Sequence, residues 1–211
     1  VMRSMTSLQY LYQAKAPSFT REYNTFRTLS ASYTYLGYNL KSPLFSDRRV
    51  RLAFAHAIDK QDIIQGALLG QGVPTVAPYK PDTWVYNHAI KDYSHDTAKA
   101  LALLEEAGWK KDPDGWLRKD GKVFSFTLLT NQGNEQRIKT AIIIQSQLRS
   151  LEIAVKIRSA EWAAFLNQFA LPGYFAAAVL SWLLPPEPDG YGVWHSFRAD
   201  GGLYFVKFAG A

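Results

Sequence analysis

Residues 123–182 are the most regular part of the chain, because their apolar and polar positions switch between the period of a strand and the period of a helix. Strand-like runs occur at residues 123–129, 153–158 and 176–182, and of these the first two alternate while the third is mostly apolar. Helical spacing is carried by Ile138, Ala141, Ile142 and Leu148 in the first intervening segment, and by Trp162, Phe165, Leu166 and Phe169 in the second. The pattern predicts strand, helix, strand, helix, strand.

Strands joined through a helix of this length almost always run parallel, with a right-handed crossover. The carboxyl ends of the three predicted strands should therefore meet at one edge, where open parallel sheets bind ligands. Turns at that edge span residues 130–134, 159–162 and 182–192. They contain amides, two tryptophans and an acidic, proline-rich loop, but no His, no Cys and no nucleophile next to a base. We expect a binding site here, and the chain is predicted not to be an enzyme.

The rest of the chain predicts helices and one long strand around this unit. Helical spacing occurs at residues 4–13, 17–23, 47–58 and 97–107, and again after Asp59. The expected N-caps are Ser46, Asp59 and Asp96.

Residues 32–40 predict a strand with tyrosines on both faces, so one face should pack while the other meets a partner or ligand. Tyr35 is the ligand-contact candidate on this strand. Residues 70–95 predict a long loop. Its expected anchors are Tyr79, Trp84 and Tyr86.

Composition narrows the classes of function. The chain has 211 residues, of which 47% are hydrophobic, so it can bury a large core. It has no Cys and only scattered His, so we predict no metal site and no cofactor. The net charge is +6, but only Arg48, Arg49 and Arg51 cluster, as expected for a solvated helix face, and no nucleic-acid partner is predicted. No apolar run reaches the ~18 residues of a membrane span.

Several motifs carry a resemblance to a known family. They are Pro43-Leu44-Phe45-Ser46-Asp47-Arg48-Arg49-Val50-Arg51, Ala57-Ile58-Asp59-Lys60, Ala98-Lys99-Ala100-Leu101, Ala107-Gly108-Trp109, Leu128-Leu129-Thr130-Asn131, and Trp182 with Pro188-Asp189. In this order and spacing, over residues 33–194, they resemble the extracellular solute-binding proteins of the dipeptide and oligopeptide type, family 5. These proteins are the substrate-capturing subunits of ABC importers.

The resemblance implies an α/β fold, one lobe of a two-lobe periplasmic-binding-protein-like fold of type II, cluster C, with a central βαβαβ unit. Residues 1–30 would be the approach from a first lobe that is absent here, and residues 31–211 the second, substrate-binding lobe, truncated at its C-terminal end. The start without Met or a leader fits a piece of a longer protein. The implied partners are a peptide or other small solute, the first lobe, and an ABC permease in the membrane.

The resemblance also implies site residues. Trp162 and Trp182 match tryptophans that line the cleft in peptide-binding relatives, and Asn131 lies at a ligand-side turn. Peptide-binding relatives place an Asp just after the Trp182 position to hold the peptide's amino terminus through a charge-assisted hydrogen bond. That place is Leu184 or Pro185 here, which leaves sugars, other oligomers and metal chelates open as ligands. The acidic residues that could substitute are Glu187 and Asp189.

The leading hypothesis is a binding module that captures a solute outside the cytoplasm, in the periplasm or on a lipoprotein anchor, and delivers it to a permease. The alternative is a sensory domain of the same fold in a transcription regulator, for which the full reading frame would show a helix-turn-helix. A hydrolase is disfavoured, because no nucleophile, base and orienting group meet at one sheet edge.

Overall fold

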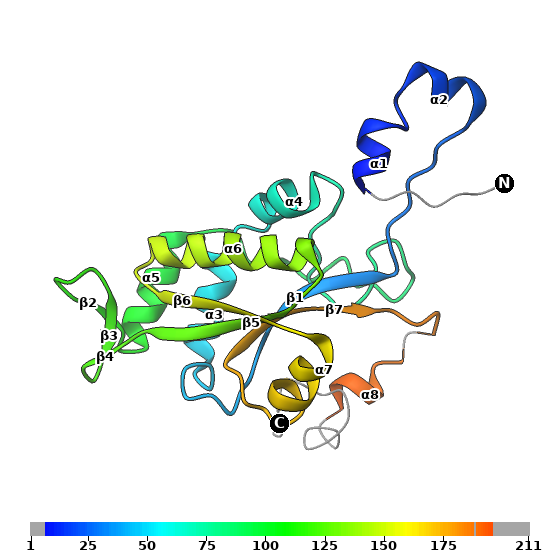
Figure 1. Cartoon of the computed structure of the whole chain (residues 1–211). Helices are drawn as coiled ribbons and strands as arrows, with labels where there is room; N and C mark the ends of the chain where they lie inside the picture. Colours follow the sequence, from blue (N-terminus) through cyan, green and yellow to red (C-terminus); the bar gives the residue numbers. More distant parts are fainter. Residues whose placement is uncertain (1–6, 188, 196–211) are drawn as a thin grey trace.

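The computed structural model describes residues 7–187 and 189–195, and its centre is a four-stranded sheet (Figure 1). The strands are β1 (Ser32–Tyr38), β5 (Ser125–Asn131), β6 (Ala154–Ala160) and β7 (Ala177–Leu183). Their order is β1-β7-β5-β6, with β5 parallel to both β6 and β7 and β1 antiparallel to β7. The predicted βαβαβ unit and its parallel strands are confirmed.

The strand order contains a reversal. The chain moves from β5 outward to β6 through α6 (Glu135–Ser150), and then returns past β5 to β7 through α7 (Trp162–Ala164) and the π-helix η1 (Phe165–Ala170). Right-handed crossovers in opposite directions place their helices on opposite faces, as Figure 1 shows for α6 and α7. The sheet therefore has a topological switch point between β5 and β7.

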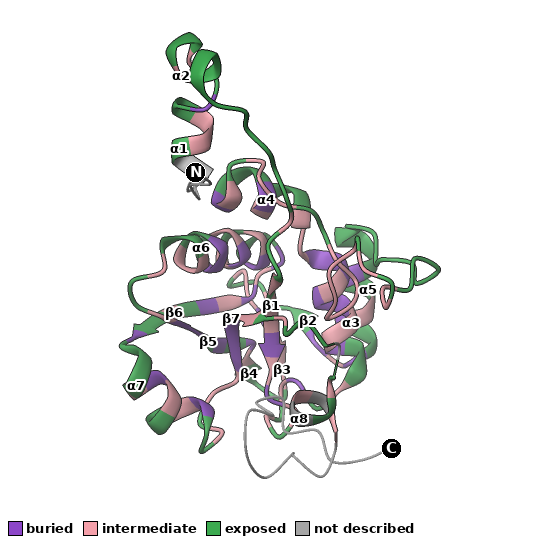
Figure 2. Ribbon diagram, turned by 90° about the vertical axis from the view of Figure 1, so that its right-hand side faces the viewer, coloured by how far each residue is buried: buried purple, intermediate pink, exposed green. Residues whose placement is uncertain are grey.

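The two faces carry separate hydrophobic clusters. On the α6 face, the main core joins the sheet to α6, α3 (Arg48–Ala57) and α5 (Thr97–Glu106). Phe126 of β5 and Phe124, which directly precedes this strand, belong to it, as the alternation predicted. On the other face, α7 and η1 cover a smaller cluster that includes Leu129 and Phe165. Figure 2 shows buried positions concentrated on β5, β7, α3 and α6.

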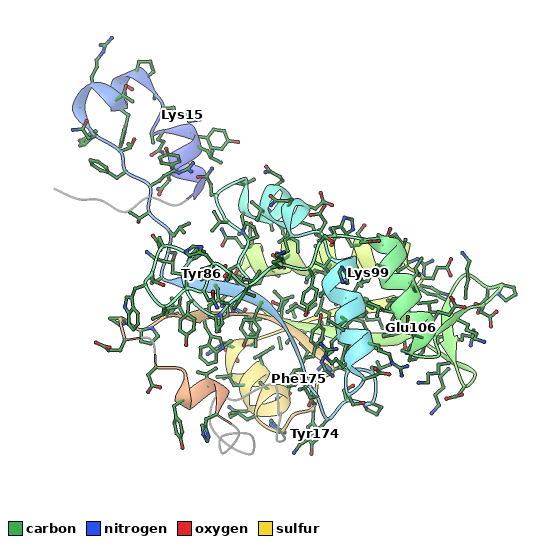
Figure 3. All side chains as sticks on the ribbon, turned by 180° about the vertical axis from the view of Figure 1, so that it is seen from behind. Lys15, Tyr86, Lys99, Glu106, Tyr174 and Phe175 are labelled. Carbon is green, nitrogen blue, oxygen red and sulfur yellow. The ribbon has the colours of Figure 1, made fainter. Side chains whose placement is uncertain are left out.

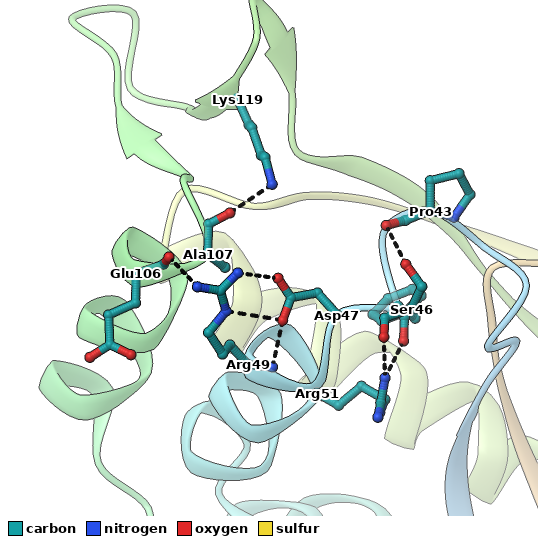
Figure 4. A network of polar contacts seen from close by, with 9 residues as sticks. Pro43, Ser46, Asp47, Arg49, Arg51, Glu106, Ala107 and Lys119 are labelled. Atoms are coloured by element: carbon teal, nitrogen blue, oxygen red, sulfur yellow. Dashed lines mark hydrogen bonds and ion pairs between the residues drawn. The ribbon is translucent and has the colours of Figure 1, made fainter. Parts of the chain in front are cut away.

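Helix N-caps follow the sequence signals with one correction. Asp59 caps α4 (Lys60–Leu68) and Asp96 caps α5, as predicted. The expected cap Ser46 is wrong for α3, because the side chain of Asp47 accepts the hydrogen bond from the Arg49 amide at 2.8 Å. The Ser46 hydroxyl instead donates to the carbonyl oxygen of Pro43 (Figure 4).

Two arginines of the cluster, Arg49 and Arg51, fix the N-terminus of α3. The Arg49 guanidinium donates to the Asp47 carboxylate and to the carbonyl oxygen of Glu106, and Arg51 donates to the carbonyls of Phe45 and Ser46 (Figure 4). The hydrogen bonds from Arg49 hold the pKa of Asp47 below its usual value. Arg49 and Arg51 thus have a structural role that the prediction of a solvated helix face did not include.

The remaining elements lie around this body. They are α1 (Ser7–Tyr12), α2 (Pro17–Glu22), β2 (Lys110–Lys111), β3 (Leu117–Lys119), β4 (Lys122–Val123) and α8 (Tyr191–Trp194). The strands β2, β3 and β4 form a small antiparallel sheet before β5. The helices α1 and α2 form an arm that extends away from the body, and α2 has no buried residue (Figures 1 and 2).

Two apolar side chains that were predicted to pack against the body of the protein, Ile142 and Trp84, are exposed. Ile142 is 51% exposed, because the buried stripe of α6 runs through Thr140, Ala141, Ile144 and Leu148. The loop over residues 70–95 is present beside the amino-terminal end of β1, near Tyr86 (Figure 3). Trp84 does not anchor it, since this side chain is 88% exposed. The family resemblance also predicts that residues near Tyr33 and residues 203–208 lie at one end of the lobe, but residues 203–208 lie outside the described part of the chain.

Candidate functional site

The turns that follow β5, β6 and β7 lie at one edge of the sheet, because these strands are parallel. At this edge β7 continues beyond the last residue of β5 and pairs there with the start of β1, with Thr34 opposite Ser181 and Tyr33 opposite Trp182. In open α/β sheets, ligands bind in the crevice outside the strand carboxyl ends at a switch point. The candidate site is therefore centred between the ends of β5 and β7.

A polar network crosses the sheet at this point. The Arg137 guanidinium, from the first turn of α6, donates from Nη1 to Asn131 Oδ1 at 2.6 Å and from Nε to Ser181 Oγ at 3.1 Å. Ser181 Oγ also lies 2.8 Å from Thr34 Oγ1. The network links β5, β7 and β1 through one partly buried cation, and burial lowers the pKa of Arg137. An arginine nevertheless stays charged at neutral pH.

An aromatic group lies next to this network, on the face covered by η1. Tyr35 and Trp182 pack against the smaller cluster, and the Trp182 indole N–H donates to the Tyr35 hydroxyl. The Tyr33 and Tyr35 rings are 5.7 Å apart between centroids. Burial raises the pKa of Tyr35 to about 12, while the Trp182 hydrogen bond and the charge of Arg137 oppose that rise. Tyr35 therefore remains a neutral phenol at physiological pH.

Trp182 is the last but one residue of β7, so the prediction that it ends the third strand is correct to within one residue. At this position β7 is paired with β1, with Trp182 opposite Tyr33. It is partly exposed and partly packed. It can therefore contribute to stability as well as to a ligand surface.

Trp162 begins α7, is separated from β6 only by the N-cap residue Glu161, and is 46% exposed. Its ring stacks on Phe165 with centroids 5.6 Å apart and an interplanar angle of 3°. Phe165 is buried at the start of η1, so it provides a fixed support for the exposed indole. Because β5 lies between β6 and β7, Trp162 and Trp182 are on either side of the strand that ends at Asn131.

The acidic candidates lie in the loop after β7. Asp189 is exposed, and its carboxylate accepts a hydrogen bond from the Tyr191 amide at 2.8 Å at the start of α8. Glu187 is also exposed. Of the predicted site residues, the structure thus links Asn131 to the polar network and Tyr35 to Trp182, while Trp162, Glu187 and Asp189 lie on neighbouring turns.

The sequence patterns missed Arg137, although a signal for it exists. Arg137 precedes Ala141, Ile144 and Leu148 at intervals of four, seven and eleven residues, so it continues the buried stripe of α6. A charged residue on a buried helical face is unusual and needs polar partners. Here the partners are Asn131 and Ser181 at the carboxyl edge.

The arrangement is suited to binding. Within residues 7–187 and 189–195, no three His, Asp or Glu side chains gather closely enough to hold a metal ion. Nor does any helix in the described part of the chain have the length and apolar character needed to cross a membrane. The edge offers aromatic faces, amides, hydroxyls and one cation, which together can contact an elongated solute with apolar and polar groups.

Comparisons with known proteins agree with this geometry. Residues 1–204 match the family described as "Bacterial extracellular solute-binding proteins, family 5 Middle". The oligopeptide-binding protein AppA of Bacillus subtilis is 41% identical over 187 residues, which are 87% of this chain and 34% of AppA. The dipeptide-binding protein of Escherichia coli is 30% identical over 150 residues, 70% of this chain and 26% of that protein.

Solved structures show the same relationship. AppA from Bacillus subtilis, in complex with a nonapeptide, superposes with a TM-score of 0.82 at 40% identity, covering 87% of this chain and 37% of that one. NikZ from Campylobacter jejuni, in complex with Ni(L-His), gives 0.76 at 28% identity, covering 87% and 37%. The chain thus spans between about a quarter and somewhat more than a third of the length of these relatives. Its matched range and its fold show that it belongs to family 5 of the bacterial extracellular solute-binding proteins.

Proposed function

We propose that this chain is the second lobe of the substrate-capturing protein of an ABC importer, and that it forms one wall of a cleft for a peptide-like solute. The observation that carries the proposal is the likeness to AppA, which covers 87% of this chain in both sequence and structure. The site residues proposed to meet the solute are Trp162, Trp182, Asn131, Tyr35, Glu187 and Asp189.

The arm supports a division between residues 1–30 and residues 31–211. Its aromatic side chains lie largely in solvent, at 79% exposure for Tyr12, 54% for Tyr23 and 85% for Phe26. Exposed apolar side chains grouped on one projecting segment favour contact with another part of the same protein. We propose that the first lobe covers this arm, and that the solute is enclosed between the two lobes.

A peptide is the preferred solute class. AppA, which is 40% identical in structure-based comparison, was solved with a nonapeptide, whereas NikZ, with its nickel chelate, is 28% identical. The edge also provides half-exposed rings beside neutral polar groups, which suits alternating side chains and main-chain amides. We further propose that the protein works outside the cytoplasmic membrane, released or as a lipoprotein, and delivers the peptide to a permease.

The test uses the full-length protein that contains this chain, purified from a bacterium that exports it. Bound molecules are released by denaturation and identified by mass spectrometry, and the emptied, refolded protein is then titrated with a synthetic nonapeptide pool by calorimetry. We expect peptides in the released fraction and saturable binding of the pool. Recovery of a sugar or a metal chelate, together with no binding of peptides, would contradict the proposal.

A further inference from the structure

Tyr33 lies at the candidate site but is not part of the packed interior. Neither hydrophobic cluster of the described residues includes it, and its ring is partly exposed. It lies opposite Trp182 in the pairing of β1 with β7, and two residues before Tyr35 on the same strand. Both relations place side chains on the same face of a sheet. The Tyr33 ring therefore continues the aromatic surface of Trp182 and Tyr35 toward the start of β1, the outer strand of the sheet.

Tyr33 has two aromatic neighbours, one on its own strand and one on a distant loop. Its ring centroid is 5.7 Å from that of Tyr35, with 43° between the ring planes. The loop over residues 70–95 passes the start of β1 near Tyr86 (Figure 3). Burial raises the pKa of the Tyr33 hydroxyl, and the phenols of Tyr35 and Tyr79 add to that rise. The loop thus brings Tyr79 close to Tyr33, which stays a neutral hydrogen-bond donor.

Hydrogen bonds within the loop restrain the segment that carries Tyr79. The Val76 amide donates to the Tyr86 hydroxyl at 3.3 Å, so this bond joins the two sides of the segment. After Tyr79, the Thr83 hydroxyl donates to the carbonyl oxygen of Lys80 at 2.6 Å. A ring on a restrained segment loses little conformational entropy when a ligand covers it.

These rings offer a surface for another aromatic side chain. Tyr33, Tyr35, Tyr79 and Trp182 are all partly exposed, so each has area that a ligand can cover. Aromatic rings pack edge-to-face or with an offset, and they gain binding energy beyond the area that they bury. The Tyr33 hydroxyl can also donate a hydrogen bond to a main-chain carbonyl oxygen of a peptide. An aromatic residue within a peptide provides both the ring and the carbonyl.

We infer that Tyr33 and Tyr79 form a subsite for one aromatic side chain of the peptide, on the β1 side of the β5–β7 crevice. The inference rests on the proposed function and adds a preference within the peptide class. The ligand-binding surface then includes the loop over residues 70–95 as well as the strand ends.

The test measures the affinity of the full-length protein for a set of nonapeptides by calorimetry. One peptide has no aromatic residue, and each of the others carries a single Phe at a different position of the same sequence. The preference at a position is the ratio of these affinities. For the unsubstituted protein, we expect Phe to strengthen binding ~10-fold at one or more positions.

The variants are Tyr33→Ala and Tyr79→Ala, with Trp84→Ala as the matched control in the same loop. We expect both tyrosine variants to reduce the preference to about twofold or less at one shared position and to keep it elsewhere. Tyr33→Phe keeps the ring and should retain most of the preference. Trp84 is 88% exposed, and its removal should leave every preference unchanged. The preference is a ratio within one variant, so it does not depend on the fraction of folded protein.

The outcomes separate this inference from the proposed function. If no peptide binds to the unsubstituted protein, the proposed function fails with the inference. If peptides bind but Phe is preferred nowhere, or both tyrosine variants keep every preference, the inference fails alone. It also fails if the two variants lose different positions, or if Trp84→Ala causes an equal loss. Loss at one shared position, with retention in Trp84→Ala, would establish the subsite.

Discussion

The two faces of the central sheet are built differently. On the α6 face, Phe45, Phe54 and Phe124 are completely buried, and the ring centroid of Phe54 lies within 6.0 Å of those of Tyr38, Phe45, Phe124 and Phe126. On the η1 face, the cluster is smaller, and its outer members Tyr35 and Trp182 stay partly exposed. One face therefore contains most of the packing, and the other presents aromatic surface next to the switch point.

The difference separates stability from recognition. Burial of apolar surface stabilises a fold by roughly 25 cal/mol per Å², so the completely buried rings should dominate the free energy of unfolding. Partly exposed rings give up part of that stabilisation, but they leave rigid area for a ligand to cover. The predictions below test this division on the full-length protein, from the largest expected effect to the smallest.

Phe54→Ala should cause the largest loss of stability. It removes a ring at the centre of the main core, where Phe54 is 0% exposed, and leaves a cavity. We expect a loss of about 3–5 kcal/mol in the free energy of unfolding, measured by urea denaturation. The control Trp84→Ala removes a side chain that is 88% exposed and should change that energy by less than ~0.5 kcal/mol. Equal losses in the two variants would contradict the division.

Trp182→Ala should reduce ligand affinity more than it reduces stability. We expect the affinity for the nonapeptide pool to fall at least ~10-fold, about 1.4 kcal/mol, in calorimetric titration. The loss in unfolding free energy should be clearly smaller than for Phe54→Ala, because Trp182 is only partly packed. Tyr35→Phe keeps the ring and removes the hydroxyl that accepts the indole hydrogen bond, so its affinity should fall less. Unchanged affinity with a large loss of stability in Trp182→Ala would assign this residue to the core.

Asp59→Ala should affect stability alone. The Asp59 carboxylate accepts a hydrogen bond from the Gln61 amide at 2.7 Å and caps α4, on the packed side of the molecule. Loss of this cap should cost about 1 kcal/mol in urea denaturation and leave the peptide affinity unchanged. Ser46→Ala is the comparison, since Ser46 does not cap α3 and contacts Pro43 instead. A larger cost for Ser46→Ala would show that the N-cap assignments are wrong.

Asp47→Asn should change how stability depends on pH. Hydrogen bonds from Arg49 lower the folded-state pKa of Asp47, so its contribution is present above the pKa that Asp has in the unfolded chain. The contribution is lost as the pH falls through the lowered folded-state pKa. The stability difference between the unsubstituted protein and Asp47→Asn should thus be largest near neutral pH and vanish in acid.

The effect of Asp47→Asn should be the smallest of the four, because the Asp47–Arg49 pair is partly exposed and screened by salt. Denaturation over a pH series measures it, and Arg49→Gln should reduce the same pH dependence. A pH profile that is identical in all three proteins would rule out a role for this ion pair.

Much of the fold follows from local signals that need no tertiary information. The change of period along residues 123–182 predicted three strands and α6, and the length of the crossovers predicted that the strands run parallel. Asp59 and Asp96 act as caps because an N-cap depends only on the next few amides. The edge that carries the site also followed from the sequence, since parallel strands end together.

Contacts between distant segments decided the rest. The position of β7 between β1 and β5, and hence the switch point, is a choice among sheet orders that local periodicity cannot distinguish. The predicted strand already included Trp182, but only the pairing of β7 with β1 placed this residue opposite Tyr33. Competition between neighbours made Asp47 the cap in place of Ser46, because a carboxylate next to Arg49 is the better acceptor there.

In the candidate site, too, some residue positions follow from the local sequence, whereas other contacts follow only from the tertiary structure. The sequence by itself determined that Asn131, Trp162 and Trp182 lie at or beside the carboxyl edge, because their distance from each strand end is a local property. Only the tertiary structure decided that Arg137 meets Asn131 and Ser181, because that contact joins α6, β5 and β7. Long-range hydrogen bonds depend on the order and register of strands, which the chain sets only when the sheet assembles.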